Sequence, residues 1–143
     1  MSRLGSFPGQ LLRLVKGLSL QQLEADPPDN HRSLHHILEH AAESEYTYLR
    51  MQIGADKEIQ TALKVSLSGS VEIRLALSAF WQKLQARTAA MTAQEMTDFI
   101  PQGITTWSAR RALRCMLEHN WEHLEEIRFR LDSQSNPNRE IDN

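Results

Sequence analysis

Cysteine is nearly absent from this sequence of 143 residues, which contains Cys115 and no other. A single cysteine excludes an intramolecular disulfide and a cysteine-rich zinc module. Glycine and proline number only six and five, and neither interrupts residues 108–131. An uninterrupted stretch of this length is typical of one long helix.

Neither sign of charge predominates, because the formal net charge is -2 and cations are mixed with anions along the chain. This gives no general argument for binding nucleic acid or an anionic membrane, and we expect neither partner. No run approaches ~18 consecutive apolar residues, so no membrane span is expected. The N-terminal residues place cations inside an apolar stretch, unlike a signal peptide, and a cytoplasmic location is the expectation.

Apolar residues recur at helical spacing in four segments, about residues 8–24, 33–53, 70–91 and 108–131, and little resembles a strand. Gly17 weakens the continuity of the first segment, and Gly54 is a natural end for the second. Residues 54–69 and 92–107 are expected to be long loops, and residues 133–143 a disordered tail. The sequence therefore predicts an all-α protein, a single four-helix-bundle domain over residues 1–132.

The apolar stripes of these segments predict the core, because a stripe with helical period faces the interior. The residues expected to be buried are Leu34, Ile37, Leu38, Leu75, Phe80, Leu113, Met116, Leu117, Leu124 and Ile127. The acidic residues of the last segment, Glu118, Glu122, Glu125 and Glu126, are expected to form a solvated face.

The last segment also carries His119 and His123, four residues apart. Residues at this spacing are neighbours on a helix surface, so both imidazoles can point at one atom. Two imidazoles make a weak metal site, and a usable one needs a ligand from elsewhere in the fold. Helical phase favours His40 over His36, because His40 lies at the edge of the apolar stripe of its segment. The alternatives are a His36–His40 pair and ligation by Cys115.

Several sharper motifs are excluded. Glu122 is not where an HExxH protease keeps its general base. Met116 and Asn120 occupy the positions that a carboxylate-rich di-iron bundle fills with glutamate. The sequence contains no P-loop, GxGxxG or GxSxG signature.

SLHHILEHAAESEYTYL, followed much later by WSARRALRCMLEHNWEHLEEI, resembles the DinB/YfiT-like superfamily of four-helix bundles. The resemblance covers about residues 8–131. It implies a divalent metal ion bound by His40, His119 and His123, the trio that helical phase also selects. The chain departs from the family at Asn120, often glutamate, and at Cys115, sometimes histidine. Neither position is a ligand in the family pattern.

The resemblance also implies a class of reaction. Characterised members include bacillithiol and mycothiol S-transferases and a thiol-dependent maleylpyruvate isomerase, so we expect a low-molecular-weight thiol and a small electrophile as substrates. Of the divalent ions that suit imidazole ligands, we expect zinc or nickel, with iron or manganese as alternatives. Two other functions stay open: hydrolysis by metal-bound water, and a non-catalytic bundle that binds a ligand or partner. A homodimer is the oligomeric state that we keep open as a partner of this chain.

Overall fold

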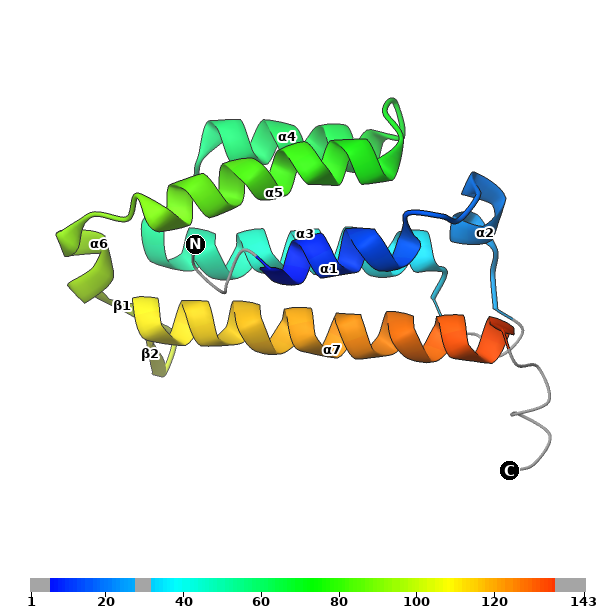
Figure 1. Cartoon of the computed structure of the whole chain (residues 1–143). Coiled ribbons are helices and arrows are strands. Elements are labelled where there is room, and N and C mark those ends of the chain that lie inside the picture. The colour runs from blue at the N-terminus through cyan, green and yellow to red at the C-terminus, as the bar shows by residue number, and fades with distance from the viewer. Residues whose placement is uncertain (1–5, 28–31, 136–143) are drawn as a thin grey trace.

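The computed structural model describes residues 6–27 and 32–135. Its elements, in chain order, are α1 (Ser6–Val15), α2 (Leu20–Glu24), α3 (Leu34–Ile53), α4 (Lys57–Ser68), α5 (Ile73–Ala89), α6 (Ala93–Thr97), β1 (Phe99–Gln102), β2 (Thr105–Ser108) and α7 (Ala109–Ser135). The long helices run side by side, and α3 and α7 point in opposite directions (Figure 1). The structure confirms the predicted all-α bundle.

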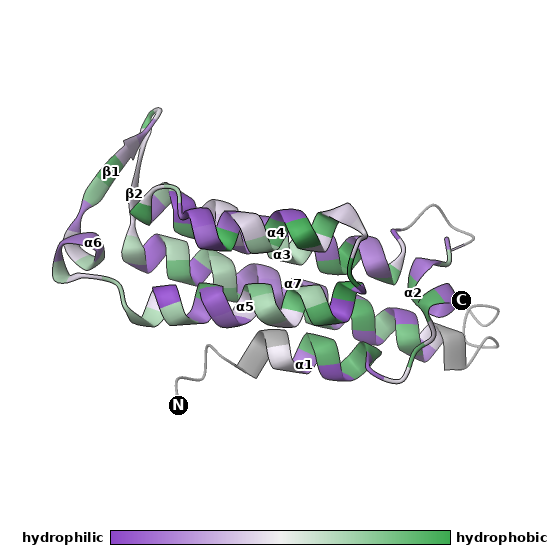
Figure 2. Cartoon of the chain, turned by 90° about the horizontal axis from the view of Figure 1, so that it is seen from above, coloured by the Kyte–Doolittle hydropathy of each residue, from purple (hydrophilic) through white to green (hydrophobic). Residues whose placement is uncertain are grey.

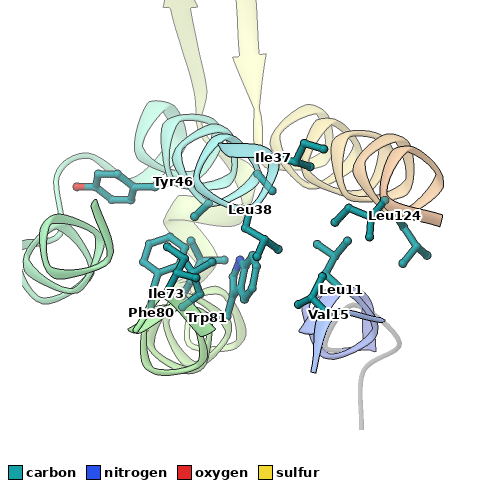
Figure 3. Packing of buried hydrophobic residues seen from close by; sticks show 14 of the residues in the cluster. Leu11, Val15, Ile37, Leu38, Tyr46, Ile73, Phe80, Trp81 and Leu124 are labelled. Carbon is teal, nitrogen blue, oxygen red and sulfur yellow. The ribbon is translucent and has the colours of Figure 1, made fainter. Parts of the chain in front are cut away.

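The bundle is formed by α1, α3, α5 and α7, with α4 packed as an additional helix against α5 and α3. The largest interface joins α3 to α7, and the second joins α4 to α5. Figure 3 shows the core between these helices. Its fully buried side chains include Leu11 and Val15 from α1, Ile37 and Leu38 from α3, Phe80 from α5 and Leu124 from α7.

The first predicted helix is two helices, α1 and α2, with a break at residues 16–19. Ser19 starts α2 in a capping box, in which its hydroxyl accepts a hydrogen bond from the Gln22 amide at 3.1 Å. The guanidinium of Arg74 donates to the carbonyl oxygens of Val15 and Leu18 at 2.9 and 2.7 Å. A side chain from α5 therefore helps to satisfy the carbonyl groups where α1 ends, together with the Leu18 amide, which donates to the Val15 carbonyl at 3.2 Å.

The prediction of a long loop at residues 54–69 is wrong, because α4 fills most of it. Asp56 caps this helix by accepting a hydrogen bond from the Ile59 amide at 3.0 Å. Gly69 ends it at φ 75°, a left-handed conformation that favours glycine. The buried face includes Ile59 and Ser66. A serine within a short apolar stripe weakens the helical signal in the sequence.

The second predicted loop, residues 92–107, contains α6 and the antiparallel hairpin β1–β2. Gln102 pairs with Thr105, and Gly103 supplies the positive φ, 64°, that the two-residue turn requires. The hairpin stands out from one end of the bundle beside α6 (Figure 2). The side-chain amide of Gln52 fixes α6 to α3 by donating to the carbonyl oxygens of Glu95 and Asp98 at 2.8 and 3.1 Å.

Most of the predicted core is confirmed, and Leu75 is the error, because its side chain is 68% exposed. The buried face of α5 is set by Ile73, Leu77 and Phe80, and Leu75 lies across the helix from them. Leu113 and Leu117 are half-buried rather than buried. The remaining predicted core residues, Leu34, Ile37, Leu38, Phe80, Met116, Leu124 and Ile127, are buried.

The helices that carry the histidines agree closely with the sequence. Ser33 caps α3 by accepting a hydrogen bond from the His36 amide at 3.1 Å, and Gly54 ends it. Ser108 accepts one from the Arg111 amide at the start of α7. This helix continues to Ser135, past its predicted end, and the rest of the predicted tail lies outside the described residues. No described helix has the length and apolar character needed to span a membrane.

Candidate metal centre

Three imidazoles meet where α3 packs against α7. The ring centre of His40 lies 5.2 Å from that of His123 and 6.5 Å from that of His119. The rings of His119 and His123 are 5.8 Å apart. Three imidazoles that bind one tetrahedral ion at about 2.0–2.1 Å have ring centres roughly 5 Å apart. The spacing of the three rings is therefore close to that of a three-histidine metal site.

Nitrogen atoms of two of these rings are free to bind an ion. Within the described part of the chain, both ring nitrogens of His123 and Nδ1 of His119 are buried without a hydrogen-bond partner. An unpaired buried polar atom costs free energy, so such atoms are uncommon in stable folds unless they serve a ligand. The donor set thus fits a divalent ion with a preference for imidazole nitrogen.

Electrostatics at the cluster favour neutral imidazoles. Burial lowers the pKa of His40, and the nearby Arg32 cation lowers it further. Burial also lowers the pKa of His123, against the opposing effect of Glu126. The neutral imidazole is the form that binds a metal ion, so both shifts favour coordination at neutral pH.

As they stand, no three histidine, cysteine or acidic side chains in residues 6–27 and 32–135 form a group that could hold an ion. The three rings would therefore have to turn about their side-chain bonds to direct their nitrogens at one point. His40 and His119 are only half-buried and have room to do so, whereas His123 is 3% exposed. Coordination by these three residues stays a prediction.

The other histidines do not join this cluster. His36 is exposed, and Nε2 of His35 lies 2.8 Å from the Glu39 carboxylate on the outer part of α3. His31 lies outside the described residues. Cys115 is half-buried one turn before His119 and lies close enough to Tyr48 to influence its hydroxyl.

An aromatic wall, which the sequence analysis missed, flanks the cluster on the side of the hairpin. The ring of Tyr48 lies 5.1 Å from His119 and stacks on Trp107 at 5.9 Å with an interplanar angle of 18°. The guanidinium of Arg111 covers the Trp107 ring at 5.3 Å. Burial raises the pKa of Tyr48, so its hydroxyl keeps its proton. The available signal was spacing, because Tyr48 follows His40 by about two helical turns.

Glu126 differs from the prediction that the acidic residues of this helix form a solvated face. Glu118, Glu122 and Glu125 are exposed, but Glu126 is half-buried and its Oε2 lies 3.6 Å from Nδ1 of His123. The guanidinium of Arg32 pairs with the same carboxylate at 3.3 Å. The sequence held a signal for this contact, since Glu126 follows His123 by three residues on one helix.

A buried acid, Glu45, lies deeper between the helices. Glu45 is 1% exposed, and burial raises its pKa to about 8, although Asn120 and Trp81 face it and oppose the shift. Its Oε1, Oδ1 of Asn120 and Nε1 of Trp81 all lack a partner of hydrogen-bonding geometry in the described part.

Comparison with known protein families finds a match that covers most of the chain. A family model described as the DinB superfamily matches residues 4–127, which is most of the chain. The match includes all three clustered histidines and the aromatic wall. No curated protein and no solved structure matches the chain.

Proposed function

The chain belongs to the DinB superfamily, and on that premise we propose that it is a divalent-metal-dependent enzyme that transfers a low-molecular-weight thiol to an electrophile. His40, His119 and His123 would hold the ion. The observation that carries this proposal is the meeting of three imidazoles from two helices, with ring centres 5.2 to 6.5 Å apart and buried unpaired nitrogens.

A divalent ion bound at this position would supply the charge that deprotonates a coordinated thiol at neutral pH. The chain would contribute the three imidazoles that hold the ion, and His40 and His119 would form a half-exposed edge through which substrates enter. The Tyr48–Trp107 stack offers an apolar wall beside that edge. In the transfer, sulfur forms a bond to the electrophilic carbon. The leaving group departs with the electron pair of the broken bond, and the thiol proton passes to solvent.

Metal content is the first test of this function. Protein purified without a histidine tag is analysed for zinc, nickel, iron and manganese, and the metal-free form is then titrated with zinc or nickel. We expect one ion per chain, with binding weakened at least tenfold in His40→Ala, His119→Ala and His123→Ala. The matched control is His36→Ala, on the same helix as His40 but exposed, which should bind as tightly as the wild type. Equal binding by all four variants would contradict the assignment.

The reaction is tested by combining metal-free or metal-loaded protein with bacillithiol, mycothiol or glutathione and a panel of small electrophiles at neutral pH. Loss of thiol and formation of the thioether are followed chromatographically. Thioether formation that requires the ion supports the S-transferase. Cleavage of an ester or amide without thiol would show that the protein is a hydrolase instead. Turnover that does not need the metal, or no turnover at all, would favour a non-catalytic binding protein.

A further inference from the structure

We infer that Glu126 is a positioning residue for the metal centre. Its carboxylate accepts a hydrogen bond from Nδ1 of His123, which leaves Nε2 of that ring for the ion. The inference rests on the proposed function and assigns a role to a residue outside the ligand set. A ligating histidine is commonly held by a carboxylate or carbonyl at its other nitrogen, which fixes the tautomer and the ring orientation.

The geometry around His123 singles out one acceptor. Its Nδ1 is buried without a hydrogen-bond partner, and Oε2 of Glu126 faces it at 3.6 Å from the next turn of the same helix. This distance is too long for a hydrogen bond, but an approach of about half an ångström brings it into the ordinary range. A change in the side-chain torsions of Glu126 can supply that movement, because its side chain is 34% exposed.

Glu126 is itself held in place from outside the helix. The guanidinium Nη2 of Arg32 lies 3.3 and 3.5 Å from its two carboxylate oxygens. The backbone of Arg32 is fixed in turn, because its carbonyl accepts a hydrogen bond from the guanidinium of Arg130. Arg130 is itself buried, with 8% of its surface exposed. The carboxylate is therefore oriented by one cation, Arg32, and the backbone of Arg32 is held by Arg130 of α7.

A contrast on the same helix separates this arrangement from an ordinary surface ion pair. Glu125 also pairs at a spacing of three residues, with Arg128 at 3.2 Å, but both side chains are about half exposed. The side chain of His123 is 4% exposed and that of Glu126 is 34% exposed. A charge contact at a buried imidazole is screened less by water than one between exposed side chains. Glu125 is therefore the matched control for Glu126.

The first experiment reads the tautomer of His123 in metal-free protein by nitrogen-15 NMR of the histidine rings, at a pH where the ring is neutral. We expect hydrogen on Nδ1 in the wild type and in Glu125→Ala. In Glu126→Ala the population with hydrogen on Nε2 should rise severalfold. A wild-type ring with hydrogen on Nε2, or no change in Glu126→Ala, would overturn the inference whether or not the protein binds metal.

The second experiment measures affinity for zinc by competition with a chromophoric chelator, together with the thermal midpoint of each metal-free variant. Glu126→Ala should bind zinc about 10- to 100-fold more weakly. Glu126→Gln should lose less, because its amide oxygen can still accept the hydrogen, and Glu125→Ala should match the wild type. A purely structural role would lower the midpoint of metal-free Glu126→Ala without this affinity loss, and that result would contradict the inference.

X-ray absorption of the zinc-loaded protein distinguishes positioning from direct ligation. Three imidazole ligands that persist in Glu126→Ala agree with a positioning role, whereas loss of an oxygen ligand in that variant would make Glu126 a ligand instead. The failures of the two proposals are also distinct. A wild type that binds no zinc overturns the proposed function, while a wild type that binds zinc with Glu126→Ala equally tight overturns the role of Glu126 alone.

Discussion

The α3–α7 pair and the pair that the additional helix α4 forms with α5 are both antiparallel, but they bury side chains of different polarity. Six polar side chains are buried in the described part of the chain: Glu45, Gln52, Ser66, Asn120, His123 and Arg130. All except Ser66 belong to α3 or α7. The α4–α5 pair instead buries apolar residues on its inner side and shows an apolar groove outside, which Val65, Val71 and Leu75 help to line.

This difference separates the part of the protein that stabilises the fold from the part that carries chemistry. Burying an apolar side chain is favourable, whereas burying a polar group without a partner costs free energy. The unpaired atoms of Glu45, Asn120 and His123 therefore reduce the stability of the α3–α7 interface. The apolar core around α5 offsets that cost, which allows the polar interface to persist.

The largest effect is expected where α5 enters the core. Leu77→Ala removes a fully buried side chain and should lower the free energy of unfolding by roughly 2–5 kcal/mol. Leu75→Ala, two residues away on the exposed side, should change it by no more than about 0.5 kcal/mol. Urea denaturation of both metal-free variants measures the difference. Equal losses would show that the exposed side of α5 is covered in solution.

A smaller effect, dependent on pH, should come from Glu45. Burial raises the pKa of this carboxyl from 4.5 to about 8, so the native state holds its proton in a pH range where the unfolded chain loses it. Stability should therefore fall as the pH rises from about 4.5 to 8, and the full shift corresponds to at most about 5 kcal/mol. Relaxation and water entry should reduce the measured loss to about 2–3 kcal/mol.

The glutamine of Glu45→Gln stays neutral, so the variant should lose most of this pH dependence. Its free energy of unfolding should therefore rise relative to that of the wild type as the pH approaches 8. Glu43→Gln, on the same helix but exposed, is the control and should keep the wild-type profile. The measurement is the urea midpoint of metal-free protein between pH 5 and 8.5. Parallel profiles for the wild type and Glu45→Gln would show that the carboxyl is ionised in the native state.

The smallest effect on stability is expected at the metal centre. His123→Ala should abolish tight metal binding but lower the stability of metal-free protein by no more than about 1–2 kcal/mol, because it also removes two unpaired nitrogens. Chelation of the wild type should leave its helical content unchanged by circular dichroism, unlike a zinc finger, whose folding energy comes largely from metal. Unfolding on chelation would make the ion structural.

Prediction from the sequence succeeded where a helix has a wide apolar stripe and clear ends, as in α3 between Ser33 and Gly54. It failed where local signals are weak. The stripe of α4 is short and includes Ser66, and the strands of the hairpin are only four residues each. The proximity of His40, His119 and His123 agrees with the helical phase of two stripes. The prediction that Leu75 is buried was wrong, because it followed the apolar character of the residue and not the helical phase set by Phe80 and Leu77.

The sequence by itself determined the helical class, the two helices that carry the histidines and the faces on which these lie, because periodicity and end signals are local properties of the chain. Tertiary structure alone decided which polar groups share a buried environment. Arg32 meets Glu126, Trp107 stacks on Tyr48, and Asn120 faces Glu45 only because α3, α7 and the hairpin pack together. Burial and charge contacts between residues far apart in the chain leave no periodic trace in its sequence, and they set the pKa of His123 and of Glu45.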